Sequence, residues 1–221
     1  MLTVNHLTLT HRKDLTVLVG SLSFTLNDGE RLALIGEEGN GKSTLLRVLA
    51  GDPSVESYIE VSGSFSCRDS AAYLPQELPE SERTLSAYDF FCMSPVFFDQ
   101  SPRELGELAA RLSLPADVFY SDQLMQTFSG GERVKLQLAR LLMSSPTTLL
   151  LDEPTNDLDS DSVLWLENFL LSCKLTVLFV SHDEALLSRT ATSILLLERL
   201  RRRQVPRATL YRMGYDQFYA E

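Results

Sequence analysis

The stretch IGEEGNGKSTLL runs from Ile35 to Leu46 and carries the skeleton Gly-x-x-Gly-x-Gly-Lys-Ser. Between a strand and a helix, this pattern is typical of a loop that wraps a phosphate chain. Its glycines let the backbone curl so that N–H groups point inward, and the following helix adds the positive end of its dipole. We therefore predict a nucleoside phosphate site in which Lys42 reaches the β- and γ-phosphates and Ser43 ligates Mg²⁺.

The same loop holds two glutamates, Glu37 and Glu38, whose negative charges repel phosphate. Backbone amides, a lysine and a metal ion account for most of the binding, so these two side chains need not face the phosphates. In solvent, the effect of a charge several ångströms away is strongly damped. We expect both carboxylates to turn outward and to weaken nucleotide affinity only slightly.

The composition describes a chain that can bury a substantial core, because 44% of its 221 residues are hydrophobic. It has no run of 18 apolar residues, which excludes a predicted transmembrane helix, and the N-terminal residues alternate instead of forming the apolar block of a signal peptide. The cysteines are widely spaced, without the pairing of a metal site: Cys67, Cys92 and Cys173. A reduced, cytoplasmic protein is the simplest interpretation.

The net charge is −10, which argues against a general nucleic-acid binder, but the charge is unevenly distributed. From Arg189 to the end, seven arginines stand against three acidic residues, a local balance of +4, so the rest of the chain carries −14. The densest basic run is ERLRRRQVPR, residues 198–207. Two interpretations stay open for this run, a solvated loop and a phosphate-binding patch.

Hydrophobic periodicity predicts an α/β chain. Period-two alternation in LTVNHLTLT and LVGSLSFTL indicates strands, and RLALIG indicates a buried strand that leads into the glycine loop. After residue 129, apolar runs such as TTLLLDEP and LTVLFVSHD alternate with helical segments, which is the order of a parallel sheet with helices between its strands.

Residues 78–128 differ from the rest because their periodicity is mostly helical. Ser101 and Glu104 form a capping-box pattern, and Pro102 suits the first position of a helix. We therefore expect one domain over residues 1–221, with a core of residues 1–77 and 129–221 and a helical insertion of residues 78–128.

The segment TTLLLDEP places two carboxylates at the end of an apolar strand. Asp152 is positioned to hold Mg²⁺ through water, and Glu153 to polarise an attacking water molecule. Two carboxylates with separate tasks suit hydrolysis of a phosphoanhydride, in which positioning and charge neutralisation do most of the catalysis.

The motifs together resemble an ATP-binding-cassette (ABC) nucleotide-binding domain. In family order they are the phosphate loop from Gly36 to Ser43, Gln76 in the Q-loop, the signature FSGGER, the Walker B strand before Asp152, the D-loop NDLD ending at Asp159, and the switch histidine His182 in VSHD. The resemblance implies an ABC-type P-loop ATPase core with a parallel sheet, an N-terminal antiparallel β subdomain and a helical subdomain insertion. It also implies ATP and Mg²⁺ as cofactors.

In this family, two cassettes sandwich two ATP molecules head to tail. The resemblance therefore implies that Ser129, Gly130 and Gly131 contact the γ-phosphate of ATP held by a partner cassette, at a helix N-terminus that suits an anion. It makes Glu153, His182 and Gln76 catalytic, with Gln76 also on the metal side. The nucleotide positions that it implies in this chain are Gly36, Glu37, Glu38, Gly39, Asn40, Gly41, Lys42, Ser43, Thr44 and Asp159.

One family feature is missing from the sequence. An aromatic residue usually stacks on adenine about 30 residues before the loop lysine, but this region reads HRKDLTV and contains no Phe, Tyr or Trp. His11 or Arg12 is the available substitute, so the preference for ATP over GTP stays open.

Two classes of cassette protein fit the sequence. The segments SGGERVKLQLARLL, with Glu132, and LLLDEPTNDLD resemble the first cassette of an ABC-F protein, a type with two cassettes on one chain that often acts on the ribosome. The alternative is the ATPase subunit of a membrane transporter, whose helical insertion docks on a transmembrane partner. A degenerate, non-hydrolysing cassette is the third reading, although all its catalytic positions are filled.

Overall fold

The computed structural model describes residues 1–67, 70–198 and 206–220. Its N-terminal part contains an antiparallel sheet in the order β2-β1-β4, formed by β1 (Leu2–His11), β2 (Val17–Leu26) and β4 (Ile59–Cys67). A turn joins β2 to the next strand, and Gly29 in this turn adopts a φ of +76°. Leu2, Val4, Leu7 and Leu9 of β1 are buried, with a shift of register between Val4 and Leu7, which confirms the half-buried strand that its sequence predicts.

The main sheet of the described chain has the order β5-β6-β7-β3-β8-β9. Its strands are β3 (Arg31–Gly36), β5 (Ala71–Leu74), β6 (Thr148–Asp152), β7 (Thr176–Val180), β8 (Ser193–Glu198) and β9 (Arg207–Tyr211). All pairs are parallel except β8 with β9, which is antiparallel. Every residue of β6 and β7 is buried, as expected for strands covered on both faces.

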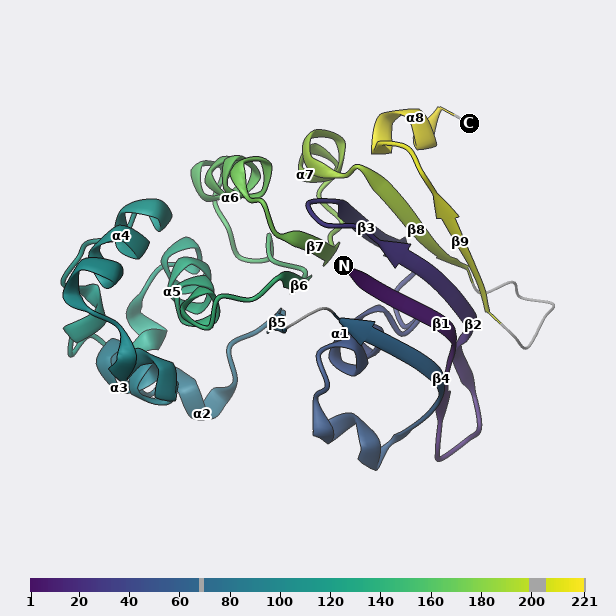
Figure 1. Ribbon diagram of the computed structural model, residues 1–221, viewed down its shortest axis with the longest axis horizontal. Helices are drawn as coiled ribbons and strands as arrows, with labels where there is room; N and C mark the ends of the chain where they lie inside the picture. The colour runs from purple at the N-terminus through teal and green to yellow at the C-terminus, as the bar shows by residue number, and fades with distance from the viewer. Residues whose placement is uncertain (68–69, 199–205, 221) are drawn as a thin grey trace.

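Helices cover the main sheet from both sides. On one face of the main sheet, leucines of α1 (Lys42–Leu49) and apolar residues of the antiparallel sheet form a shared core. The far face packs against α5 (Gly130–Met143), α6 (Ser160–Ser172) and α7 (Glu184–Thr190), and α8 (Tyr215–Tyr219) lies beside α7 at the C-terminal end (Figure 1). The phosphate loop follows β3 and Asp152 ends β6, and only β7 lies between these two strands. Both therefore lie at the carboxyl edge of one parallel sheet, where α/β folds bind ligands.

The helical insertion forms a separate lobe beside α5 (Figure 1). Its elements are α2 (Glu80–Arg83), α3 (Ala87–Cys92), α4 (Pro102–Leu112) and the 3₁₀ turns Pro95–Asp99, Val118–Tyr120 and Met125–Thr127, while another 3₁₀ turn, Pro53–Ser57, follows α1. The predicted capping box is present at the start of α4. Phe90, Phe91 and Phe119 are fully buried in the lobe.

The helix α5 joins this lobe to the core. Arg140 of α5 pairs with Glu82 at 2.9 Å, and its guanidinium lies 3.8 Å from the centre of the Phe90 ring. The same helix packs its apolar face in the core under the sheet. The helix α5 therefore contacts both parts of the proposed division, the helical insertion of residues 78–128 and the flanking core segments.

Candidate functional site

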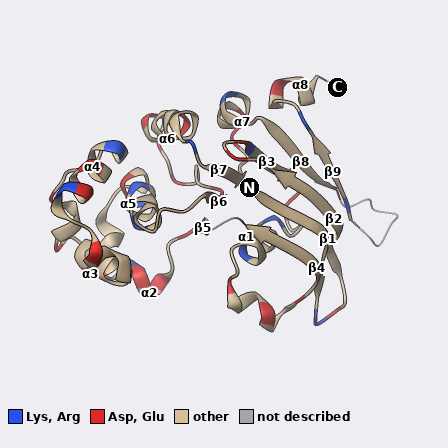
Figure 2. Cartoon of the chain, viewed as in Figure 1, with Lys and Arg blue, Asp and Glu red and all other residues tan. Residues whose placement is uncertain are grey.

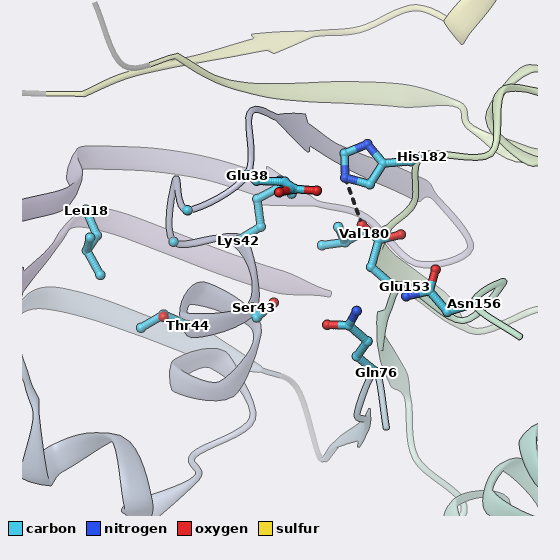
Figure 3. A pocket seen from close by; sticks show the side chains of 12 residues that line it. Leu18, Glu38, Lys42, Ser43, Thr44, Gln76, Glu153, Asn156, Val180 and His182 are labelled. Carbon is cyan, nitrogen blue, oxygen red and sulfur yellow. Dashed lines mark ion pairs between the residues drawn. The ribbon is translucent and has the colours of Figure 1, made fainter. Parts of the chain in front are cut away.

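A cavity of about 580 Å³ opens at the carboxyl ends of β3, β6 and β7. Figure 3 shows its wall, which combines the glycine loop, the start of α1, the segment after β5 and the ends of β6 and β7. The described residues that line it are Leu18, Glu38, Gly39, Gly41, Lys42, Ser43, Thr44, Gln76, Glu153, Asn156, Val180 and His182.

Tight packing holds the loop backbone in its curled form. Gly36 has a φ of +152°, and a Cβ at this position would lie 2.4 Å from the Leu197 carbonyl oxygen. The buried side chain of Asn40 donates a hydrogen bond to that same oxygen at 3.1 Å. The side chain of Asn40 therefore anchors the loop to β8, and the nucleotide contact that the resemblance implies for Asn40 stays a prediction.

Lys42 lies across the mouth of the loop. Its Nζ donates hydrogen bonds to the carbonyl oxygens of Gly36 at 2.8 Å and Glu37 at 3.0 Å. Burial lowers the pKa of Lys42, while the charges of Glu153, Glu38 and Asp152 act in the opposite direction. The ammonium is thus held by its own loop, at the position where the sequence predicts the β- and γ-phosphates.

The two loop glutamates behave differently. Both are exposed, and Glu37 is not among the described residues that line the cavity. Glu38, however, lines the cavity near Lys42 (Figure 3), so the expectation that both carboxylates turn outward is wrong for this residue. The charge of Glu38 raises the pKa of Lys42, which is the attraction expected between opposite charges.

Oxygen ligands suited to Mg²⁺ meet beside the loop. The Ser43 hydroxyl donates a hydrogen bond to Oδ1 of Asp152 at 3.0 Å, and the Asp152 carboxylate is only 1% exposed. Gln76 follows β5 and extends into the same cavity (Figure 3). A hydroxyl, a carboxylate and an amide oxygen are hard donors of the kind that Mg²⁺ takes in phosphate sites, so the residues present fit this ion.

The carboxylate after Asp152 faces the cavity from a strained backbone. Glu153 has a φ of +46°, and its N–H donates to the Val180 carbonyl oxygen at 3.0 Å. Its Oε1 lies 3.1 Å from Nε2 of His182 (Figure 3). Burial raises the pKa of Glu153, while His182 and Lys42 act to lower it. The sequence-predicted catalytic pair is therefore in contact.

Neither His11 nor Arg12, the two substitutes for the missing adenine-stacking ring, is among the described residues that line the cavity. His11 pairs with Asp14 at 3.1 Å, and Arg12 donates from Nε to the Ile59 carbonyl oxygen at 3.0 Å. Within the described wall of the cavity, Leu18 occupies this side instead. Sequence reasoning missed Leu18 because it searched for rings, whereas a leucine next to the loop offers an apolar surface without one.

The signature residues lie outside this wall. Ser129 caps α5, and its side chain and that of Glu132 form a capping box. Gly130 touches the D-loop, since a Cβ there would lie 2.1 Å from the Asp157 carbonyl oxygen. A Cβ on Gly131 would lie 2.1 Å from Oγ of Ser162 in α6. The two glycines are thus required by contacts within this chain.

Another cavity, of about 230 Å³, adjoins the first one on the side of the signature. Gln76 and Asn156 line both cavities, and Gly130 lines only the smaller one within the described chain. Asp159 caps α6, where hydrogen bonds from Ser162 lower its pKa. The fold brings together the phosphate loop, Gln76, Glu153 and His182, and keeps Ser129, Gly131 and Asp159 apart from them.

The comparison with protein families agrees with this arrangement, because residues 19–156 match the family described as ABC transporter. The chain belongs to this ABC family. The cassette is accordingly an ATPase domain, and the resemblance to the ABC-F type is confirmed by its relatives. One of these is elongation factor 3 of Phytophthora infestans, 34% identical over 82% of this chain and 17% of the relative.

Another relative is the tylosin resistance ATP-binding protein TlrC of Streptomyces fradiae, 32% identical over 84% of this chain and 40% of the relative. The cassette thus spans well under half the length of these curated relatives. A crystal structure of a nucleotide-free ATP-binding cassette from an ABC transporter covers the whole chain with a TM-score of 0.75 and 15% identity, which confirms the fold. Among the described residues, no helix is long and apolar enough to cross a membrane.

Proposed function

We propose that the cassette binds ATP with Mg²⁺ and hydrolyses it as one half of a head-to-tail pair of cassettes. The observation that carries this proposal is the division of the site. One cavity holds the phosphate loop, Gln76, Glu153 and His182, whereas Ser129 and Gly131 lie beyond its wall. A second cassette, on the same chain or on another, supplies the missing signature.

The proposed chemistry follows from the positions of the side chains. The loop amides and Lys42 bind the phosphates of ATP and neutralise their charge. Glu153 accepts a proton from the attacking water, and its contact with His182 orients it toward the cavity. When bound, Mg²⁺ neutralises charge on the β- and γ-phosphates; Ser43 and Asp152 would hold it, with Gln76 beside them.

We further propose that the full protein is a cytoplasmic ABC-F factor that acts on the ribosome, in translation or antibiotic resistance. Its relatives include an elongation factor and a tylosin resistance protein, which supports this class. Figure 2 shows acidic residues on α2 and α3, which do not suit a contact with RNA. The basic run at 198–207 is the candidate for an RNA contact, but residues 199–205 lie outside the described chain.

The alternative function is that of a transporter ATPase subunit. It is favoured by exposed rings on the helical lobe, where Phe98 is 66% and Tyr120 is 57% exposed. Large apolar side chains on a surface often mark a contact with another protein. In that case the lobe docks on a transmembrane partner.

One experiment separates the two classes. Glu153→Gln, made together with the equivalent change in any second cassette of the full gene product, removes the proton acceptor and traps the ATP-bound pair. We expect the trapped protein to co-sediment with ribosomes in ATP and to leave them without nucleotide. Recovery in a membrane fraction instead would support the transporter class, and sedimentation with ribosomes that is independent of ATP, or recovery in neither fraction, would contradict both proposals.

A further inference from the structure

The carboxylate of Asp152 is held on both of its oxygens. Oδ1 accepts from the Ser43 hydroxyl at 3.0 Å, and Oδ2 accepts from the Tyr73 hydroxyl at 2.9 Å. Tyr73 lies on β5, which pairs in parallel with β6 so that Tyr73 stands beside Leu150, two residues before Asp152. An almost completely buried carboxylate thus receives one donor from α1 and another from the adjacent strand.

A third residue orients the tyrosine. Nε of Arg47 donates a hydrogen bond to the Tyr73 oxygen at 3.4 Å. Because a guanidinium can only donate, the tyrosine oxygen accepts from Arg47 and its proton is free to point at Asp152. Successive hydrogen bonds of this kind polarise one another.

We propose that Tyr73 is a positioning residue of the magnesium site, which orients Asp152 by holding its Oδ2 so that Oδ1 faces Ser43. This inference rests on the proposed function, because it concerns the same Mg²⁺. A tyrosine suits this task better than a lysine or arginine at the same place. It satisfies the buried oxygen without neutralising the negative charge that attracts the cation.

Tyr73 also lies close to the Q-loop in sequence. The strand β5 ends at Leu74, and Gln76 enters the cavity two residues later. The hydrogen bond to Asp152 therefore fixes the end of the strand from which Gln76 extends. Two of the predicted metal-side residues, Asp152 and Gln76, are tied to each other through this one tyrosine.

The test compares Tyr73→Phe with Tyr58→Phe in the full chain. Tyr58 also hydrogen-bonds Arg47, so its variant removes a phenol hydroxyl from the same arginine without touching Asp152. ATP binding is measured by calorimetry over a Mg²⁺ titration and again in EDTA, together with the thermal midpoint of each variant without nucleotide. We expect Tyr73→Phe to need about tenfold more Mg²⁺ for half-maximal enhancement of ATP binding, the scale of an outer-shell hydrogen bond.

In EDTA, we expect the affinity of Tyr73→Phe for ATP to equal that of the wild type, and Tyr58→Phe to follow the wild-type Mg²⁺ titration. A Tyr73→Phe variant with wild-type dependence on Mg²⁺ overturns the inference, even if its thermal midpoint falls. An equal loss of affinity with and without Mg²⁺ overturns it too, because it shows a general structural role. Absence of any Mg²⁺ effect in the wild type would instead overturn the proposed magnesium site, and this inference with it.

Discussion

Nε2 of His182 lies 3.1 Å from Oε1 of Glu153, and the two residues follow the ends of the adjacent parallel strands β7 and β6. The pairing of these strands thus creates the contact between the sequence-predicted base and the switch histidine. Burial raises the pKa of Glu153 because it disfavours the charged carboxylate, and His182 acts to lower that pKa.

The pKa of Glu153 is expected to lie above its ordinary value of 4.5, because burial is the largest influence on it. Its carboxylate becomes a competent base only above that raised pKa, so hydrolysis should fall as the pH drops through it. Titration of ¹³C-labelled glutamate carboxyls by NMR measures the value, with Glu153→Gln to assign the signal. His182→Ala should raise the pKa further. A signal that titrates at or below 4.5 would contradict the prediction.

Lys42→Ala should weaken MgATP binding by about 1.5–3 kcal/mol, the range for hydrogen bonds from a charged group, because it removes the cation of the loop. Calorimetry with MgATP measures this loss. Lys13→Ala, in the exposed turn between β1 and β2, is the matched control and should bind like the wild type. Equal affinities for Lys42→Ala and wild type would show that backbone amides alone are sufficient.

Glu38→Gln should tighten ATP binding by less than about 1 kcal/mol, since it removes an exposed negative charge at the cavity wall. Glu37→Gln, its neighbour outside that wall, should have a smaller effect. Nucleotide titrations at low and high salt distinguish the two, because screening should reduce the Glu38 effect. Loss of binding in Glu38→Gln would show instead that this carboxylate organises the loop through Lys42.

Gly131→Ala should destabilise the fold by about 1–3 kcal/mol, the usual cost of overpacking, because the new Cβ collides with Ser162. Gly106→Ala lies within α4 with no atom near the added methyl group, and should stabilise by about 0.5–1 kcal/mol. Urea unfolding gives both free energies. If the two variants had the same free energy of unfolding, the contact between Gly131 and α6 would contribute nothing to the stability of the fold.

The specific ATPase activity of the isolated chain should rise as the protein is concentrated, because each cavity needs the signature of a second cassette. Steady-state hydrolysis over a wide range of protein concentrations tests this. Ser129→Ala should reduce the activity of concentrated protein, whereas binding of ATP to dilute protein should not change. A constant specific activity across dilution, at the rate of an efficient enzyme, would argue that one chain hydrolyses ATP alone.

Much of the fold could be predicted because the relevant signals are local. The capping box at Ser101 depends on residues three positions apart, and the buried strands β6 and β7 are marked by short continuous apolar runs. The phosphate loop and the pair Asp152 and Glu153 were identified for the same reason. Each is a motif within a few residues of chain, so its chemistry can be read without knowing its neighbours in space.

Other features depend on residues far apart in the chain. Glu38 lines the cavity together with Lys42 and the distant Glu153, and Leu18 lines it because β2 passes close to Gly41 of the loop. The hydroxyl of Tyr73 reaches Asp152 only because β5 and β6 pair in one register. A linear pattern reports which groups a chain carries, but the distance between two groups depends on how its strands pair and its helices pack.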